Sequence, residues 1–109
     1  MAGRRRGVVW TESARADLDD AVAYIAERSR DAAVMILSAG LEVASTLAEH
    51  AERGRVVPEI DEQPIRELFL HKYRLIYRVT DDSVEVLAFL HGSRDFARWT
   101  RERSKPPHN

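Results

Sequence analysis

The sequence contains no cysteine, and this absence excludes several kinds of site. Neither a disulfide framework nor a thiolate zinc site can form, and a chain without thiols suits a reducing cytoplasm. The four histidines, at positions 50, 71, 91 and 108, show no ligand spacing, so zinc would need scattered carboxylates as ligands. We therefore expect a cytoplasmic protein with no bound metal and no cofactor.

Long apolar runs are missing as well. No stretch approaches the roughly 18 residues of a membrane span, and the start Met1–Arg6 lacks the apolar segment of a signal peptide. The patterns GxSxG, GxxxxGK[ST] and GxGxxG do not occur, so a hydrolase elbow, a P-loop and a dinucleotide cradle have no support. We expect a soluble protein without a membrane partner or small-molecule cofactor.

The chain of 109 residues has no internal repeat and no linker, and we treat residues 1–109 as one domain. A chain of this size buries roughly two thirds of its unfolded surface in a single core. Residues 1–6 and 104–109 are polar and basic or rich in proline, and we expect them to be flexible tails.

The net charge of −1 hides a division along the chain. Residues 12–62 contain 12 acidic and 5 basic residues, whereas residues 63–109 contain 9 basic and 6 acidic residues. A polyanionic partner would therefore meet the C-terminal half rather than the predicted helices.

Apolar spacing predicts a short strand over residues 7–10 and then two helices joined by a short turn. Thr11 is placed as the N-cap of the first helix and Asp31 as the N-cap of the second. Each helix carries one apolar stripe, formed by Ala14, Leu18, Ala21 and Ile25 in the first and by Ala33, Leu37, Gly40, Ala44 and Leu47 in the second.

The C-terminal half alternates as strands do. An irregular loop over 56–64, which contains two prolines, comes first. The pattern then predicts three consecutive antiparallel strands, which are residues 65–70 and the two runs on either side of Asp81 and Asp82. A short helix over 94–103 can follow. We therefore predict an α+β fold: a small antiparallel sheet with a helical hairpin packed on one face, in the order β-α-α-β-β-β, with a possible short C-terminal helix.

The register of the last hairpin decides which side chains share a face. A four-residue loop pairs Thr80 with Ser83 and makes a core face of Tyr73, Leu75, Tyr77, Val79, Val84, Val86, Ala88 and Leu90. The other face then collects Lys72, Arg74, Ile76, Arg78, Glu85, Leu87, Phe89 and His91. A three-residue loop would instead place Arg74 and Arg78 opposite Leu90 and Val86.

The predicted register gathers Arg74, Arg78, His91 and Arg94 at one face and one end of the sheet. Such a set can grip phosphates or stabilise the charge of a nuclease transition state, with His91 as general acid or base. The simpler interpretation is structural, because Arg78 faces Glu85 and Arg74 can stack on Phe89. Along the basic C-terminal segment, Trp99 can stack on a nucleobase, and Arg98, Arg101, Arg103 and Lys105 can follow a partner or simply face solvent.

Five segments in order resemble one family. They are WTESARADLDDAVAYIAERS, GRVVPE, IREL, YRLIYRV and FLHGSRD, and together they resemble the RelE/ParE toxins of bacterial type II toxin–antitoxin modules over residues 8–96. The resemblance implies a toxin neutralised by a cognate antitoxin that folds on its surface. The residues expected to bind the antitoxin are Lys72, Arg74, Ile76, Leu87 and Phe89.

The family divides between two targets, and the resemblance is more ParE-like than RelE-like. Arg74 and Arg94 match two arginines of the RelE-type site, which cuts messenger RNA on the ribosome. However, Ile65 and Glu67 stand where such nucleases have lysines, and Thr100 stands at their C-terminal tyrosine position. The HGSRD ending is closer to ParE toxins, which inhibit DNA gyrase without hydrolytic residues.

The resemblance therefore implies gyrase inhibition first. A ribosome-dependent endoribonuclease using Arg74, Arg94 and His91 is the alternative, and a degenerate toxin that acts only as an antitoxin-binding co-repressor is a third. The residues expected to contact the target or a nucleic acid are Arg74, Arg78, Arg94, Arg98, Trp99 and Arg101.

Overall fold

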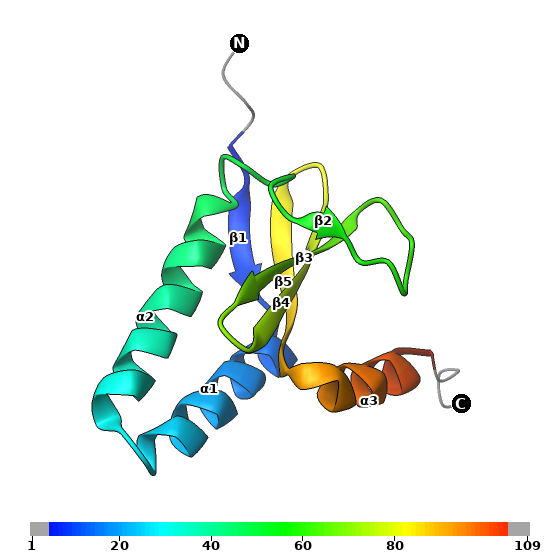
Figure 1. Ribbon diagram of the computed structural model, residues 1–109. Helices are drawn as coiled ribbons and strands as arrows, with labels where there is room; N and C mark the ends of the chain where they lie inside the picture. Colours follow the sequence, from blue (N-terminus) through cyan, green and yellow to red (C-terminus); the bar gives the residue numbers. More distant parts are fainter. Residues whose placement is uncertain (1–4, 105–109) are drawn as a thin grey trace.

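The computed structural model describes residues 5–104, apart from the side chains of residues 93, 94 and 104. Residues 1–4 and 105–109, which form most of the predicted flexible tails, lie outside this range. The elements are β1 (Gly7–Trp10), α1 (Glu12–Ala26), α2 (Arg30–Thr46), β2 (Arg55–Val56), β3 (Ile65–Leu70), β4 (Tyr73–Val79), β5 (Ser83–His91) and α3 (Gly92–Ser104). Figure 1 shows α1 and α2 on one side of the sheet and α3 on the other. The predicted α+β fold is confirmed.

Both helices of the hairpin begin at a side chain that accepts a backbone hydrogen bond. Thr11 Oγ1 accepts from the amide of Ala14 at 3.2 Å, as predicted. The second N-cap is Ser29, whose hydroxyl accepts from the amide of Ala32 at 3.1 Å, so the prediction of Asp31 as the cap is wrong. Asp31 lies instead in the first turn, where its charge interacts favourably with the helix dipole.

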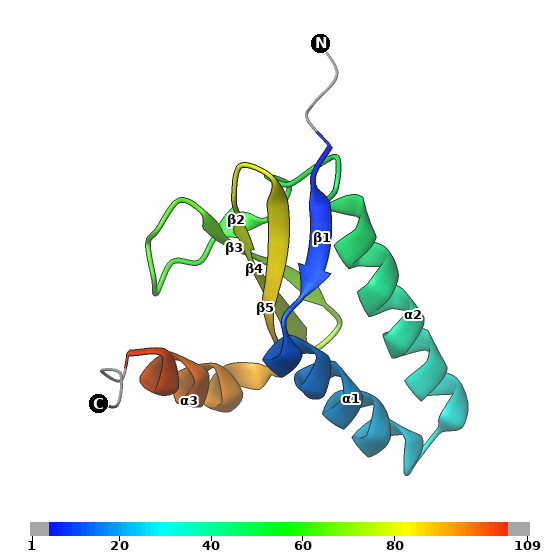
Figure 2. The same ribbon diagram turned by 180° about the vertical axis from the view of Figure 1, so that it is seen from behind.

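The sheet has five strands in the order β1-β5-β4-β3-β2. The pairs β2–β3, β3–β4 and β4–β5 are antiparallel, whereas β1 pairs with β5 in parallel. Figure 2 shows β1 beside β5. β2 lies at the other edge, in a stretch where Pro58 and Pro64 led us to expect only irregular structure.

The β4–β5 hairpin follows the predicted register only near its turn. Val79 pairs with Val84, and the amide of Thr80 donates to the carbonyl of Ser83 at 2.8 Å. Between Ile76 and Tyr77 the register shifts, so Arg74 pairs with Leu90 and not with Phe89. The prediction is wrong beyond this point because Leu87 is an extra residue in β5, and such a β-bulge moves the following side chains to the opposite face.

The helical hairpin covers one face of the sheet with the larger core. Its buried residues include Leu18 and Leu47 from the helical side and Leu75, Tyr77 and Phe89 from the strands. Phe89 is only 3% exposed because the bulge turns it toward the helices, where its ring stacks on Tyr73 at 4.8 Å between centroids. Burying each side chain of this size contributes roughly 1.5–3 kcal/mol to folding.

A buried tyrosine fixes the segment that follows α2. The Tyr77 hydroxyl donates to the carbonyl of Ala51 at 2.8 Å and accepts from the amide of Gly54 at 2.9 Å. A Cβ on Gly54 would lie 2.6 Å from this hydroxyl and from the carbonyl of Glu67, so only glycine fits. This anchor positions the start of β2 beside β3.

The opposite face of the sheet carries a smaller core under α3. Its buried members are Val57, Ile65, Ile76, Ala88, Leu90 and Phe96, with Trp99 packed against them. Charged side chains from β2, β3 and β4 border this core. In the part of the chain that the structure describes, no helix is long and apolar enough to cross a membrane.

Candidate functional site

A buried carboxylate lies at the border of the smaller core. Glu67 is 1% exposed, and its Oε1 accepts hydrogen bonds from Nε of Arg74 at 2.9 Å and from Nη2 at 2.5 Å. Its Oε2 accepts from Nε of Arg55 at 2.6 Å. The side chain of Arg74 is only 11% exposed, whereas that of Arg55 is 60% exposed. One carboxylate on β3 therefore joins two arginines from the neighbouring strands.

A second carboxylate reaches Arg74 from the loop before β3. Nη2 of Arg74 lies 3.3 Å from Oε1 of Glu59. Burial raises the pKa of the Glu59 carboxyl, but a backbone hydrogen bond and the charges of Arg74 and Arg55 outweigh this effect and lower the pKa below its usual value. Two carboxylates, those of Glu59 and Glu67, therefore contact the guanidinium group of Arg74.

Two aromatic rings complete the surroundings of Arg74. Its Cζ lies 4.0 Å from the centre of the Phe96 ring and 5.6 Å from that of Phe69, over which Arg55 also lies at 5.3 Å. Phe69 itself is 57% exposed. We call this set the Arg74 cluster: Arg55, Glu59, Glu67, Phe69, Arg74 and Phe96.

Among the described residues of the predicted nuclease site, His91 does not converge on Arg74. His91 pairs with Tyr73, whose ring it meets edge-on at 5.1 Å, so both lie on the face opposite to that of the neighbouring Arg74. Arg94 belongs to α3, but its side chain lies outside the described residues. Arg78 pairs with Glu85 as predicted, although no described ion pair joins the two side chains.

The candidate target residues on α3 divide between core and surface. Trp99 packs on Phe96 with 5.9 Å between ring centroids, and Arg103 lies over its ring at 5.6 Å. Trp99 is therefore a partly buried member of the smaller core rather than a free stacking platform. Arg98 and Arg101 are exposed on the helix, and Lys105 lies outside the described residues.

The predicted antitoxin surface needs a correction. We expected Ile76, Leu87 and Phe89 to form an exposed apolar patch, but Ile76 is 0% and Phe89 is 3% exposed. The reason is that α3 covers Ile76, and the bulge turns Phe89 into the larger core. Leu87 is half-buried and Lys72 is exposed in the β3–β4 turn, so these two residues do reach the surface.

Sequence reasoning missed the carboxylates that surround Arg74. Glu67 was noted only as the replacement of a lysine, and Glu59 and Arg55 were not singled out. The available signal was alternation, because Glu67 and Phe69 lie two residues apart on one face of β3. Their contact with Arg74 depends on the β3–β4 register, in which Phe69 lies opposite Arg74.

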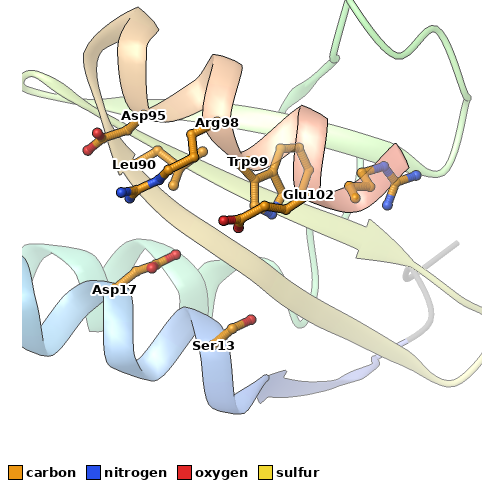
Figure 3. A pocket seen from close by; sticks show the side chains of 8 residues that line it. Ser13, Asp17, Leu90, Asp95, Arg98, Trp99 and Glu102 are labelled. Atoms are coloured by element: carbon orange, nitrogen blue, oxygen red, sulfur yellow. The ribbon is translucent and has the colours of Figure 1, made fainter. Parts of the chain in front are cut away.

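A groove separates α1 from α3 and has β5 as its floor. Two adjoining hollows, of about 300 and 420 Å³, share Asp17, Leu90, Asp95 and Arg98 as lining residues. Figure 3 shows Ser13 and Asp17 on one wall and Asp95, Arg98, Trp99 and Glu102 on the other, with Leu90 between them. We call this feature the α1–α3 groove.

Asp17 is a half-buried carboxylate of the groove. Its Oδ2 accepts a hydrogen bond from the amide of Phe89 at 3.1 Å, just after the bulge. Burial raises the pKa of the Asp17 carboxyl, the hydrogen bond from Phe89 opposes this shift, and the nearby charge of Asp20 adds to it. Among the described residues, no group of histidines and carboxylates is arranged to hold a metal ion.

The fold and its charged sheet face define a small α+β protein in which a helical hairpin covers one side of a mixed sheet. The family model of the ParE toxin of type II toxin–antitoxin systems, parDE, matches residues 8–96. The chain therefore belongs to the ParE toxin family. None of the proteins with curated functions is significantly similar in sequence.

Two solved structures share the fold. One is the chromosomal ParDE toxin–antitoxin system from P. aeruginosa, with a TM-score of 0.67 and 22% identity over 82% of this chain and 98% of that chain. The other is the toxin–antitoxin complex RelBE2 from Mycobacterium tuberculosis, with a TM-score of 0.58 and 25% identity over 82% of this chain and 93% of that chain.

Proposed function

We propose that the protein is a toxin that binds DNA gyrase and inhibits it. A cognate antitoxin neutralises this toxin. The family match to ParE toxins over residues 8–96 supports the toxin role. The antitoxin partner is supported by the two similar structures, both of which are toxin–antitoxin systems.

The preference for gyrase rests on the hydrogen bonds between Arg74 and Glu67. Catalysis of phosphoryl transfer needs cations that are free to meet the charge developing on the phosphate. Nε and Nη2 of Arg74 are instead bound to Glu67 Oε1, at 2.9 and 2.5 Å, in a nearly closed environment. A phosphate approaching Arg74 would meet the Glu67 carboxylate beside it, and repulsion would oppose cleavage. A toxin that acts by binding a protein has no such requirement.

The exposed members of the predicted target surface remain suitable for binding. Arg98 and Arg101 lie exposed along α3, and Arg55 and Phe69 are exposed beside the Arg74 cluster. Arginine and aromatic side chains are the residues that most often anchor protein interfaces. For the antitoxin, we propose a contact surface around Lys72 and Leu87 that extends to Phe69.

A ribosome-dependent endoribonuclease is the second candidate. It is favoured by the likeness to RelBE2 and by the position of Arg74, which matches an arginine of the RelE-type site. This function would require Arg74 to leave Glu67 when RNA binds. The two candidates thus differ in one respect: the Arg74–Glu67 contact stays intact in a gyrase inhibitor, whereas it must break when RNA binds to a nuclease.

The test uses antitoxin-free protein in two parallel assays. The first measures DNA supercoiling by gyrase, and the second maps cleavage of messenger RNA with and without ribosomes. We expect gyrase inhibition with intact message, both for the wild type and for the control Arg30→Ala, which removes an exposed arginine at the start of α2, outside the proposed surfaces. Ribosome-dependent cuts that Arg74→Ala abolishes would instead establish the nuclease. If induction of the protein alone leaves growth unchanged, the toxin role is wrong and the antitoxin-binding co-repressor takes its place.

A further inference from the structure

The α1–α3 groove collects acidic side chains from two helices that are far apart in the sequence. Asp17 and Asp20 lie one turn apart on α1, and Asp95 faces them from the first turn of α3. The described basic side chains of this larger hollow are His91 and Arg98, and no described ion pair involves either of them. Carboxylates therefore outnumber cations in the groove.

These carboxylates also lack partners within the described residues. No described ion pair involves Asp17, Asp20 or Asp95, and one oxygen of Asp17 is occupied by the amide of Phe89. The pKa of Asp17 is raised, first by burial and then by the charges of Asp20 and Asp95, although the hydrogen bond from Phe89 and the charge of Arg98 oppose this shift. A cation in the groove would relieve the repulsion between these carboxylates.

Aromatic rings line the same groove. Tyr24 lies on α1 two turns after Asp17 and is 61% exposed, and the stacked rings of Tyr73 and Phe89 form part of the floor. Tyr24 already has one cation near its face, because Cζ of Arg28 lies 6.0 Å from its centre. Carboxylates beside aromatic faces are the surroundings that a guanidinium or ammonium group prefers.

The floor of the groove also offers a place for an extended chain. β1 pairs with β5 only as far as Val86, so beyond this residue β5 has no strand neighbour on that flank within the described chain. The amide of Phe89 is occupied by Asp17, so an added strand could pair with β5 only beyond Phe89, at its last residues. An extended peptide can add to such a strand edge and direct a side chain into a neighbouring hollow.

From these features we propose that the α1–α3 groove binds an arginine or lysine side chain carried by an extended segment of the antitoxin. The cation lies between Asp17, Asp20 and Asp95 and against the ring of Tyr24. The site shares no lining residue with the Arg74 cluster, whose arginines are already paired with carboxylates. Only the assignment of the segment to the antitoxin rests on the proposed function, since the chemistry of the groove does not depend on toxicity.

The test is an NMR titration of the full chain with the peptide acetyl-Ala-Arg-Ala-amide. The matched probe replaces arginine by citrulline, which has nearly the same shape but no charge. We expect the arginine peptide to shift backbone amide signals of residues 17–24 and 89–95, and the citrulline peptide to bind at least about tenfold more weakly. Increasing the salt concentration should weaken binding of the arginine peptide only.

Three variants sharpen the test. Asp20→Asn should weaken binding of the arginine peptide by up to about fivefold, as expected for one partly exposed charge. Asp19→Asn removes the same charge from the same helix outside the groove and should change affinity by less than about twofold. Arg98→Ala removes the competing cation and should tighten binding.

The proposal is overturned if both peptides bind equally, if the shifts map elsewhere, or if neither peptide binds at millimolar concentration. Equal effects of Asp19→Asn and Asp20→Asn would also overturn it. The proposed function fails by a different result, which is the absence of growth inhibition. A chain that binds the arginine peptide as described and yet is not toxic would therefore refute only the toxin role.

Discussion

The Arg74 cluster and the α1–α3 groove both concentrate charge, but they differ in how that charge is balanced. In the Arg74 cluster, the buried carboxylate of Glu67 satisfies Arg74 and Arg55 within the chain. In the α1–α3 groove, four carboxylates line the walls together with two arginines, and none of the four has an ion-pair partner among the described residues; they are Asp17, Asp20, Asp95 and Glu102.

This difference separates charge that maintains the fold from charge that is open to a partner. Removing one partner of a buried ion pair leaves an unpaired buried charge and lowers the free energy of unfolding. The members of the Arg74 cluster are therefore expected to behave as structural residues. Exposed charges without partners contribute little to folding and are available for binding. Charge balance is therefore a better guide to function here than the number of arginines on a strand.

The largest effect is expected from breaking the Arg74 cluster at Glu67. Glu67→Gln leaves the nearly buried Arg74 without its main counter-charge, and we expect the free energy of unfolding to fall by about 3–5 kcal/mol. Urea unfolding followed by circular dichroism measures this loss. Glu59→Gln is the matched control, and its effect should stay below about 1 kcal/mol because the Glu59 side chain is 51% exposed.

A double variant tests whether the loss comes from an unpaired charge. Glu67→Leu combined with Arg74→Met removes both charges and keeps apolar volume beside Ile76 and Phe96. Replacing a buried ion pair in this way is often neutral or stabilising, so the double variant should unfold within about 1 kcal/mol of the wild type. If it is as unstable as the sum of the two single variants, the pair is not coupled and the structural account of the cluster is wrong.

The smallest effect is expected from Asp17 in the groove. Because the folded-state pKa of Asp17 lies above the ordinary value of 3.8, its contribution to stability is fully present below that value and is lost as the pH rises through the folded-state pKa. Asp17→Asn keeps an acceptor for the amide of Phe89 without the charge. The melting temperature at pH 7 should therefore rise by about 1–3 °C, and the gain should disappear in acid.

Repeating the thermal scans at several pH values measures this difference directly. A variant that melts below the wild type at pH 7 would show that Asp17 is a favourable charge in the fold. That outcome would remove the contrast between the groove and the Arg74 cluster.

Much of the fold could be predicted because its elements follow simple apolar periods. The stripe of Ala14, Leu18 and Ala21 is buried as expected, and residues 65–70 form a strand with the predicted bounds. Ser29 and Asp31 are both good capping residues, so the sequence does not distinguish them, and the backbone placed Ser29 at the cap.

The site was harder to predict because it depends on strand register. Residues 86–90 are all apolar, so no polar side chain in the sequence marks the position at which the bulge shifts the pattern. For that reason Phe89 was expected on the wrong face. Glu67 meets Arg74 and Arg55 only across three paired strands, one of which has just two residues, and such contacts leave no short-range signal.

The central claim is that Arg74 is a structural residue and that toxicity comes from binding gyrase. The most direct test is to compare the wild type with the Glu67→Leu, Arg74→Met double variant in the gyrase supercoiling assay. Our account predicts that both proteins inhibit supercoiling, with half-maximal concentrations within about threefold of each other, a difference of about 0.7 kcal/mol. A folded double variant that has lost all inhibition would show that Arg74 acts in toxicity itself and would contradict the account.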